Sequence, residues 1–303
     1  MDGSPAGATG RFAPSPTGPL HLGNLRTALA AWLFARSTGA RFIVRMEDLD
    51  RVTSSANHAA AQLRDLALLG LDWDGEVLYQ SDRFDLYHAA IDRLVDAGST
   101  YPCYCSRREI RTAASAPHAD DNNRYPGTCR DLDVVERRAR EATRRVPALR
   151  LRTGGERVAF IDAIHGRNEG VVDDVVLRRN DGVPAYNLAV VVDDAAQGIG
   201  QVVRGDDLLA ATPNQIHLAG LLGLPQKTYA HVPLMLGPDG NRLAKRDGAV
   251  TLDDRLALGE TPDDVRNYLL RSLGVKQSAL PLHDLAERFS AEWLITTPFI
   301  FPG

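Results

Sequence analysis

Residues 11–36, which read RFAPSPTGPLHLGNLRTALAAWLFAR, constrain the fold of this chain more than any other segment. Three prolines and two glycines stiffen its first half into a polar loop. From His21 onwards, apolar residues recur three and four positions apart, which predicts a helix with one buried face. A loop that opens into a helix N-terminus presents unpaired N–H groups and the positive end of the helix dipole, which favours a phosphate. Alternatively, the loop only shapes a turn and His21 caps the helix.

The runs around this helix predict an open parallel α/β sheet. Residues 41–46 form a β-branched run, and a brief apolar stretch precedes the loop, so strands flank the helix on both sides. In such a sheet, ligands bind beyond the carboxyl ends of the strands. Gly39 is placed to end the first helix. Further strands are predicted at residues 148–152, 157–162, 171–177, 186–194 and 201–209, and further helices at residues 82–97, 212–223 with Thr212 as its cap, and 261–274 with Thr261 as its cap.

The 303 residues are enough for one sizeable core or two smaller ones. We expect a sheet domain formed by residues 11–100 and 186–256, split by an insertion at residues 101–185. A small helical part at residues 257–303 follows it, and residues 1–10 are expected to be a disordered lead. No signal peptide and no run of eighteen apolar residues is present, so we expect a cytoplasmic protein without a membrane partner.

A second loop, GPDGNRLAKRDG at residues 237–248, carries positive charge on a glycine-rich segment. Lys245 is one of only three lysines in the chain, and Arg246 follows it. A cationic loop of this kind that folds over a polyphosphate would stabilise the charge that builds up during adenylyl transfer. Read alone, the same loop is also compatible with an ordinary solvated surface segment.

Several motifs, taken in order, resemble a known family. PSPTGPLHLGN resembles the HIGH signature of class I aminoacyl-tRNA synthetases, and RLAKR resembles their KMSKS loop, with Ala244 where a serine is frequent. Together with RMEDLD, YNLAVVVDD and VVRGDDLL, they resemble the glutamyl-tRNA synthetase family from Arg11 to about residue 256. The short C-terminal part is similar to that of the compact glutamyl-queuosine tRNA(Asp) synthetases. The resemblance implies a Rossmann-type catalytic domain that activates L-glutamate with ATP and transfers it to queuosine in the anticodon of tRNA(Asp).

The resemblance also implies residue roles. A glutamate pocket needs positive or donor-rich groups for two carboxylates and an acid for the ammonium. The adenine is expected against the backbone near residues 233–236, and Mg²⁺ is expected to accompany ATP, without assigned protein ligands. Read alone, each pocket arginine is equally compatible with a surface ion pair. The implied glutamate-binding residues are Arg11, Ala13, Ser15, Glu47, Tyr186 and Arg204, the implied ATP-binding residues are His21, Gly23, Asn24, Lys245 and Arg246, and His21, Asn24 and Lys245 are the implied catalytic residues.

Three cysteines lie close together in the predicted insertion, at Cys103, Cys105 and Cys129. Their odd number argues against a disulfide framework and indicates a metal site or free thiols. The resemblance implies a structural Zn²⁺ with Tyr125 as fourth ligand, and His118 is the alternative on general chemical grounds. Three reduced thiols packed in a small core are the other interpretation.

The same insertion is rich in arginine, although the net charge of the whole chain is −4. A local basic face is enough to contact RNA phosphates. A solvated helix with Arg–Glu pairs is the alternative interpretation. The candidate RNA-facing residues are Arg107, Arg108, Arg111, Arg137, Arg138, Arg140, Arg144 and Arg145.

Three other functions remain open from the sequence. A short glutamyl-tRNA synthetase would charge the 3′ end of tRNA, and a small-molecule adenylyltransferase would lack the glutamate-binding set. A non-catalytic paralogue that binds an amino acid or RNA would not need both His21 and Lys245. An anticodon loop presented directly to the active site would require little extra surface for tRNA recognition. We expect the protein to act as a monomer.

Overall fold

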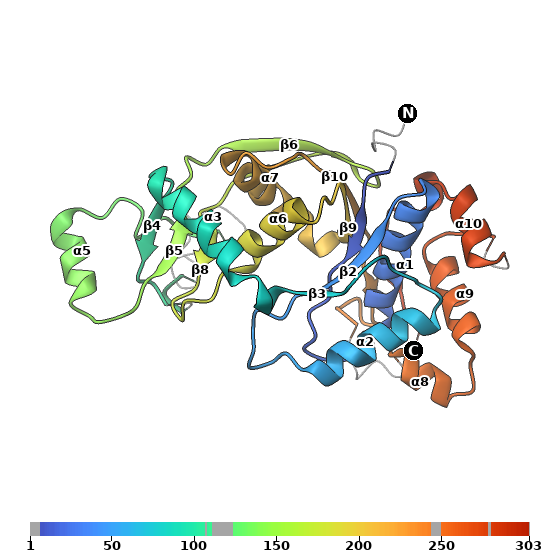
Figure 1. Ribbon diagram of the computed structural model, residues 1–303. Coiled ribbons are helices and arrows are strands. Elements are labelled where there is room, and N and C mark those ends of the chain that lie inside the picture. The colour runs from blue at the N-terminus through green and yellow to red at the C-terminus, as the bar shows by residue number, and fades with distance from the viewer. Residues whose placement is uncertain (1–6, 107, 111–123, 244–249, 278–279, 303) are drawn as a thin grey trace.

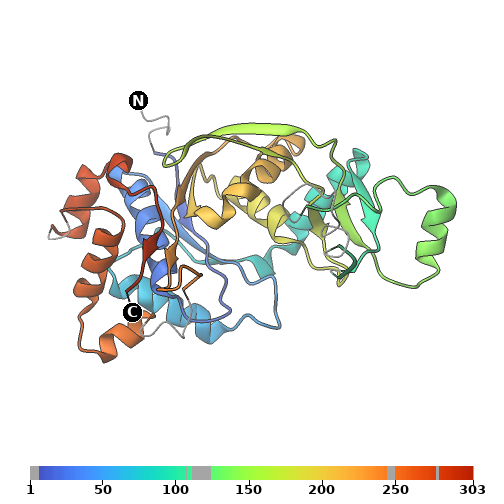
Figure 2. The same ribbon diagram turned by 180° about the vertical axis from the view of Figure 1, so that it is seen from behind.

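The structure is a computed structural model that describes residues 7–106, 108–110, 124–243, 250–277 and 280–302. A parallel sheet with helices around it occupies the middle of the molecule (Figure 1). The C-terminal helices lie at one end, and an arm that carries α5 extends from the other (Figures 1 and 2). Within the described residues, no helix has the length and apolar character needed to cross a bilayer.

The central sheet follows the parallel α/β plan expected from the sequence. Strands β1, β2 and β3 pair in parallel, and α1 connects β1 to β2. A parallel bridge between Thr9 and Ile199 connects this set to β9, which pairs in parallel with β10. The elements are β1 Gly10–Phe12, α1 Leu22–Ser37, β2 Phe42–Met46, α2 Ala56–Leu68, β3 Leu78–Tyr79, η1 Gln80–Asp82, α3 Phe84–Asp96, α6 Tyr186–Ala196, β9 Gln201–Gly205, η2 Asp206–Ala211, α7 Thr212–Leu221 and β10 Thr228–Val232.

The segment between α3 and α6 divides into two parts. One part is an antiparallel sheet in the order β4-β5-β8, from which the arm with α5 extends. The other is the hairpin β6–β7, whose Asp162 pairs with Tyr229 of β10, so that this hairpin adds to the central sheet. The elements are β4 Thr100–Cys103, α5 Val134–Glu141, β5 Ala148–Leu151, β6 Arg157–Asp162, β7 Gly166–Val171 and β8 Val176–Arg178.

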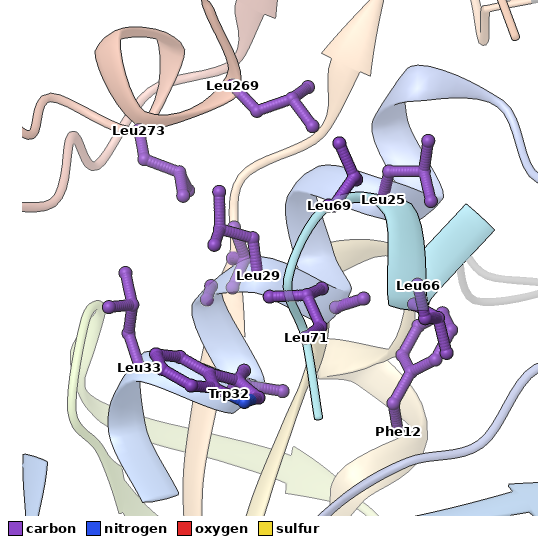
Figure 3. Packing of buried hydrophobic residues seen from close by; sticks show 14 of the residues in the cluster. Phe12, Leu25, Leu29, Trp32, Leu33, Leu66, Leu69, Leu71, Leu269 and Leu273 are labelled. Atoms are coloured by element: carbon purple, nitrogen blue, oxygen red, sulfur yellow. The ribbon is translucent and has the colours of Figure 1, made fainter. Parts of the chain in front are cut away.

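Helix α1 is the centre of the main core. Its side chains Leu25, Leu29 and Trp32 are fully buried against α2 on one side and the C-terminal helices on the other (Figure 3). Buried Arg26 joins the layers, because its guanidinium donates to Pro233 O, Ser272 Oγ and Ser272 O. The C-terminal elements are β11 Met235–Leu236, α8 Leu252–Ala257, α9 Pro262–Ser272, α10 Leu282–Arg288, η4 Ala291–Trp293 and β12 Phe299–Ile300.

The prediction of a strand at residues 186–194 is wrong, since this segment is helix α6. Its run of valines favours a strand by propensity, but a short buried run cannot be assigned by periodicity alone. The helix is fixed by burial against α3 and α7 and by two buried acids near its end. Asp193 accepts from Gln80 and Tyr87 and pairs with Arg83.

Two smaller predictions also fail. Residues 171–177 are not one strand, because the chain turns at Asp174, whose carboxylate accepts from Tyr101 and Thr153. Thr212 does not cap α7: η2 runs directly into the helix, and the threonine hydroxyl bonds Leu208 O instead. The cap at Thr261 is confirmed, with Asp264 completing a capping box.

Candidate active site

A cleft of about 610 Å³ lies where β1 and β9 end and α1 begins. All predicted glutamate-binding residues and all described ATP-binding residues line it. The cleft therefore brings together residues from distant parts of the chain, as expected for a site at the carboxyl edge of a parallel sheet. The lining residues discussed below are Arg11, Ala13, Ser15, His21, Gly23, Asn24, Glu47, Gln62, Tyr186, Arg204, Asp207, Arg242 and Leu243.

The start of α1 is held by a reciprocal cap between His21 and Asn24. The Asn24 N–H donates to His21 Nδ1 at 3.2 Å, and the His21 N–H donates to Asn24 Oδ1 at 3.2 Å. Since Nδ1 is an acceptor, a neutral His21 carries its proton on Nε2. Burial and Arg242 both lower the pKa of His21, which favours this neutral form. The ring is thus a hydrogen-bond donor at a helix N-terminus, where an anionic phosphate is favoured.

Gly23 allows the imidazole to take this position. A Cβ at residue 23 would lie 2.9 Å from His21 Cε1 and Nδ1, closer than side-chain atoms normally approach. The same first turn leaves the backbone of α1 open to the cleft. The sequence thus places a glycine where the predicted ATP-binding surface requires one.

Lys245 and Arg246 lie outside the described residues, but both flanks of their loop reach the cleft. On one flank, Arg242 and Leu243 line it, and Arg242 pairs with Asp207 at 2.8 Å. On the other, Val250 O accepts from the Leu22 N–H at 2.7 Å. The chain therefore leaves and rejoins the described structure beside the helix start that would bind ATP.

Arg11 and Glu47 belong to a buried ion network below the cleft. Arg11 donates to Val203 O at 3.0 Å and lies 3.4 Å from Asp194, while Arg45 pairs with Asp194 at 2.9 Å and with Glu47 at 3.2 Å. Burial raises the pKa of Glu47, and the two arginines oppose that rise. The carboxylate is held in place by Arg45 and faces the same cavity as Arg11, so it is positioned for a cationic group.

Arg204 is a buried cation whose hydrogen-bond partners among the described residues are all neutral. Its Nε donates to His231 Nε2 at 3.1 Å, and its terminal nitrogens donate to Gln215 Oε1 at 2.7 Å and Thr212 Oγ1 at 2.8 Å. Only 5% of the residue is exposed, and burial lowers its pKa. In the described part of the chain it forms no ion pair. A carboxylate ligand in the cleft would supply the missing negative charge.

The remaining predicted glutamate contacts come from α6 and from the loop after β1. Tyr186 opens α6 and lines the cleft, and burial raises the pKa of its hydroxyl. Ala13 and Ser15 also line the cleft. Their loop is held by Gln62 of α2, whose amide donates to Ser15 O and Gly18 O. The loop is therefore anchored to α2 by two hydrogen bonds.

Sequence reasoning missed the residues that hold this site together. Gln62 lies in a helix rich in alanine. A polar residue on the buried face of that helix was the signal that could have indicated it. Asp194 belongs to a motif that the sequence analysis used but was not given a role. The partners of Arg204 gave no signal, because they lie in two other elements of the chain, β10 and α7. The missed residues are Arg45, Gln62, Asp162, Asp194, Thr212, Gln215 and His231.

The three cysteines and Tyr125 meet outside the cleft. Their sulfurs all lie within 4.8 Å of one another, with Cys105 and Cys129 Sγ at 3.6 Å. Tyr125 Oη lies 3.4 Å from Cys103 Sγ and 3.5 Å from Cys105 Sγ. A tetrahedral zinc with bonds of about 2.3 Å to sulfur and about 2.0 Å to oxygen requires about 3.8 Å between sulfurs and about 3.5 Å between sulfur and oxygen. These four residues therefore fit the ion, while His118 lies outside the described residues.

Of the predicted RNA-facing arginines, Arg137, Arg138 and Arg140 lie on helix α5 of the arm. Helix α5 has no buried residue, and several of its arginines are exposed. Tyr104 contacts Glu141 at 3.3 Å, and Arg145 pairs with Glu109 at 3.0 Å, so part of the charge is used within the arm. Arg107 and Arg111 lie outside the described residues. Both interpretations of the basic segment, an RNA-facing surface and a solvated helix, agree with this geometry.

Comparison with known proteins gives a consistent result. Residues 8–295 match the family described as tRNA synthetases class I (E and Q), catalytic domain. The chain is 58% identical to a glutamyl-Q tRNA(Asp) synthetase of Nocardia farcinica, covering 97% of this chain and 93% of that protein. It is 48% identical to one of Symbiobacterium thermophilum, covering 91% and 92%. A glutamate–tRNA ligase of Nitratidesulfovibrio vulgaris is 43% identical, covering 93% of this chain and 61% of the ligase.

Solved structures agree with these sequence relatives. The fold is similar to a glutamate tRNA ligase of Elizabethkingia meningosepticum in complex with its amino acid. The TM-score is 0.82 at 25% identity, covering 97% of this chain and 67% of that one. A glutamate-tRNA synthetase of Elizabethkingia anophelis gives a TM-score of 0.83 at 25% identity, covering 98% and 68%.

Proposed function

The chain belongs to the class I tRNA synthetases of the glutamate and glutamine type, and on that premise we propose that it activates L-glutamate with ATP without tRNA. It then transfers the glutamate to the queuosine base in the anticodon of tRNA(Asp). It is an aminoacyl-tRNA ligase of the glutamyl-Q tRNA(Asp) type, the name that its relatives at 58% and 48% identity carry.

The observation that carries the proposal is the charge pattern of the cleft. Arg204 offers a buried positive charge without a carboxylate partner in the described structure, and Arg11 offers a second guanidinium. Glu47 offers a buried carboxylate in the same cavity. This pattern is complementary to a ligand with two carboxylates and one ammonium, which is the charge pattern of glutamate.

Adenylate formation needs positioning and charge neutralisation more than a covalent nucleophile. A carboxylate oxygen of glutamate attacks the α-phosphorus of ATP, and the bond to pyrophosphate breaks in line with it. In our proposal, the Nε2–H of His21 donates to a phosphate oxygen, and the positive end of the α1 dipole favours the phosphates at the same place. Asn24 holds the His21 ring, and Gly23 leaves room for both ring and nucleotide. Lys245 and Arg246 of the adjacent loop would supply positive charge to the polyphosphate, and Mg²⁺ bound with ATP would supply further charge neutralisation there.

In the second step, a nucleophilic oxygen of the modified nucleoside attacks the adenylate carbonyl, and AMP leaves. The alternative, a short glutamyl-tRNA synthetase that charges the 3′ end, is not favoured, because the glutamate–tRNA ligase above is less similar at 43% identity. We infer that the arm contributes RNA contacts through its exposed arginines. The proposal places the protein in the cytoplasm with the tRNA, and we expect it to act as a monomer.

A structural zinc in the arm is part of the proposal. The ion would be held by Cys103, Cys105, Tyr125 and Cys129. It would stabilise a segment whose own apolar core is small. The backbone N–H of Cys129 donates to Tyr125 Oη at 2.8 Å, and Arg150 lies 3.8 Å from the centre of the Tyr125 ring. Both contacts favour negative charge on the phenol oxygen, as zinc ligation requires.

The activation step is tested by ATP–pyrophosphate exchange with glutamate in the absence of tRNA. We expect exchange with L-glutamate and little with L-glutamine or L-aspartate, since neither places two carboxylates at the glutamate spacing. Exchange that required tRNA would instead support the 3′-charging alternative. Absence of exchange under every condition would contradict catalysis.

A further inference from the structure

We propose that Asp162 and His231 form a positioning pair that holds Arg204 in its glutamate-binding orientation. The inference rests on the proposed function, because it assigns a role in binding glutamate to two residues outside the cleft lining. His231 lies on β10 and Asp162 ends β6, so the hairpin within the predicted insertion reaches the site through them. Both side chains are fully buried.

The hydrogen bonds around His231 determine where its proton lies. Arg204 Nε can only donate, and it is 3.1 Å from His231 Nε2, so Nε2 must be an acceptor. The ring proton then lies on Nδ1, which is 2.6 Å from Asp162 Oδ2 and donates to it. The lowered pKa of His231, caused first by burial and opposed by Asp162, agrees with a neutral ring. Asp162 therefore selects the tautomer that can accept from Arg204.

Asp162 is itself fixed by the backbone. Its Oδ1 accepts from the N–H groups of Ile164 and His165 at 3.0 Å, and from the His231 N–H at 3.2 Å. With Oδ1 committed to these donors, Oδ2 is left for the imidazole. The chain of contacts then runs from the backbone through Asp162 and His231 to the Arg204 guanidinium.

Thr212 and Gln215 complete the arrangement from α7. Thr212 Oγ1 accepts from Arg204, lies 3.0 Å from His231 Nε2 and lies 3.2 Å from Leu208 O, to which it donates. The hydroxyl proton is thus committed to Leu208, and Nε2 remains available to Arg204. Because its three nitrogens donate to three different acceptors, the guanidinium is held in one orientation. A ligand carboxylate can then bind without a rearrangement of the Arg204 side chain.

The isosteric change Asp162→Asn tests the pair. Because three backbone N–H groups hold the side-chain oxygen, the new NH₂ group faces Nδ1 and donates to it. His231 must then carry its proton on Nε2, where it opposes the Arg204 Nε–H. We expect a tenfold to hundredfold rise in the KM for glutamate in exchange, roughly the loss of one hydrogen bond to a charged group, with the KM for ATP within about twofold of wild type.

Three further variants make the result decisive. His231→Gln retains an oxygen acceptor near the Nε2 position and is expected to recover part of the glutamate affinity that His231→Leu loses. If Asp162→Asn does not fold, the comparison of these two His231 variants still tests the positioning role. Asp174→Asn changes another buried aspartate that does not line the cleft, and it should leave both KM values unchanged. The glutamate Kd of each variant, measured by calorimetry, should follow its KM.

The outcomes separate the two proposals. An active wild type whose glutamate KM and Kd are unchanged by Asp162→Asn and His231→Leu would overturn the positioning role. Equal rises in the KM for glutamate and ATP would also overturn it, since they would indicate general damage to the site. A wild type that binds glutamate without exchange would contradict the proposed function, and the Kd values would still decide the positioning role.

Discussion

Replacement of Arg204 by alanine should abolish most of the glutamate affinity while changing the stability of the free protein much less. The guanidinium makes three hydrogen bonds to His231, Gln215 and Thr212 and has no carboxylate partner among the described residues. Removing the guanidinium leaves buried acceptors without a donor, which lowers the free energy of unfolding. It also removes a desolvated charge, which raises the free energy of unfolding again in part. The two effects oppose one another in the free protein. Neither compensates for the lost carboxylate contact when glutamate binds.

The size of the effect follows from the contact that a carboxylate would make. A hydrogen bond to a charged group contributes about 1.5–3 kcal/mol, so loss of a bidentate contact costs about 3 kcal/mol or more. That corresponds to a rise in Kd of roughly 100-fold or more. Calorimetric titration with glutamate measures it, and pyrophosphate exchange should show the same rise in KM with little change in the KM for ATP.

Arg83→Ala is the matched control. Arg83 is also a partly buried arginine, but its Nε already donates to Asp193 at 2.7 Å. Its removal should lower the melting temperature without changing the glutamate Kd. If Arg204→Ala bound glutamate with wild-type affinity, the assignment of the buried cation as a carboxylate receptor would be wrong. If Arg83→Ala lowered the glutamate affinity as much as Arg204→Ala does, general destabilisation of the protein would explain both losses.

Three other variants test separate parts of the site. Burial raises the pKa of Glu47, so its charge is lost on mild acidification at a higher pH than for an exposed glutamate, and the KM for glutamate should rise there. Glu47→Gln should raise this KM at neutral pH, where the wild-type carboxylate is charged, and should flatten the pH profile. A profile left unchanged by the substitution would exclude Glu47 as the ammonium partner. Lys245→Ala should lower kcat for exchange by about 100-fold or more with an unchanged glutamate Kd, and a parallel loss of binding would contradict its role on the polyphosphate. Metal analysis should find about one zinc per chain in wild type and less in Cys105→Ser, with a lower melting temperature for the variant; wild-type protein without zinc would favour three packed thiols.

The sequence indicated residues that line the cleft better than it predicted the elements that support them. The loop before α1 and its helix start are encoded locally by prolines, glycines and a capping pair, so a local pattern was enough to identify them. The basic loop at residues 237–248 and the group of three cysteines could be recognised in the sequence for the same reason. The loops and the helix start are continuous in the chain, and the three cysteines lie between residues 103 and 129.

The supporting elements depend on contacts between distant residues. The valine run of α6 has strand propensity, and only its burial between α3 and α7 makes it helical. The partners of Arg204 come from β10 and α7, and the acid that sets the tautomer of His231 comes from β6. No local pattern encodes such a set, and therefore Asp162 and His231 became visible only in the structure.

The position at which glutamate is attached tests the central claim most directly. Labelled glutamate, ATP and the protein are incubated with queuosine-containing tRNA(Asp) and with the same tRNA lacking queuosine, and the product is cut into anticodon-loop and 3′ fragments. We expect label on the anticodon-loop fragment of the queuosine-containing tRNA alone. Label on the 3′ fragment, or equal labelling of both tRNAs, would contradict the claim.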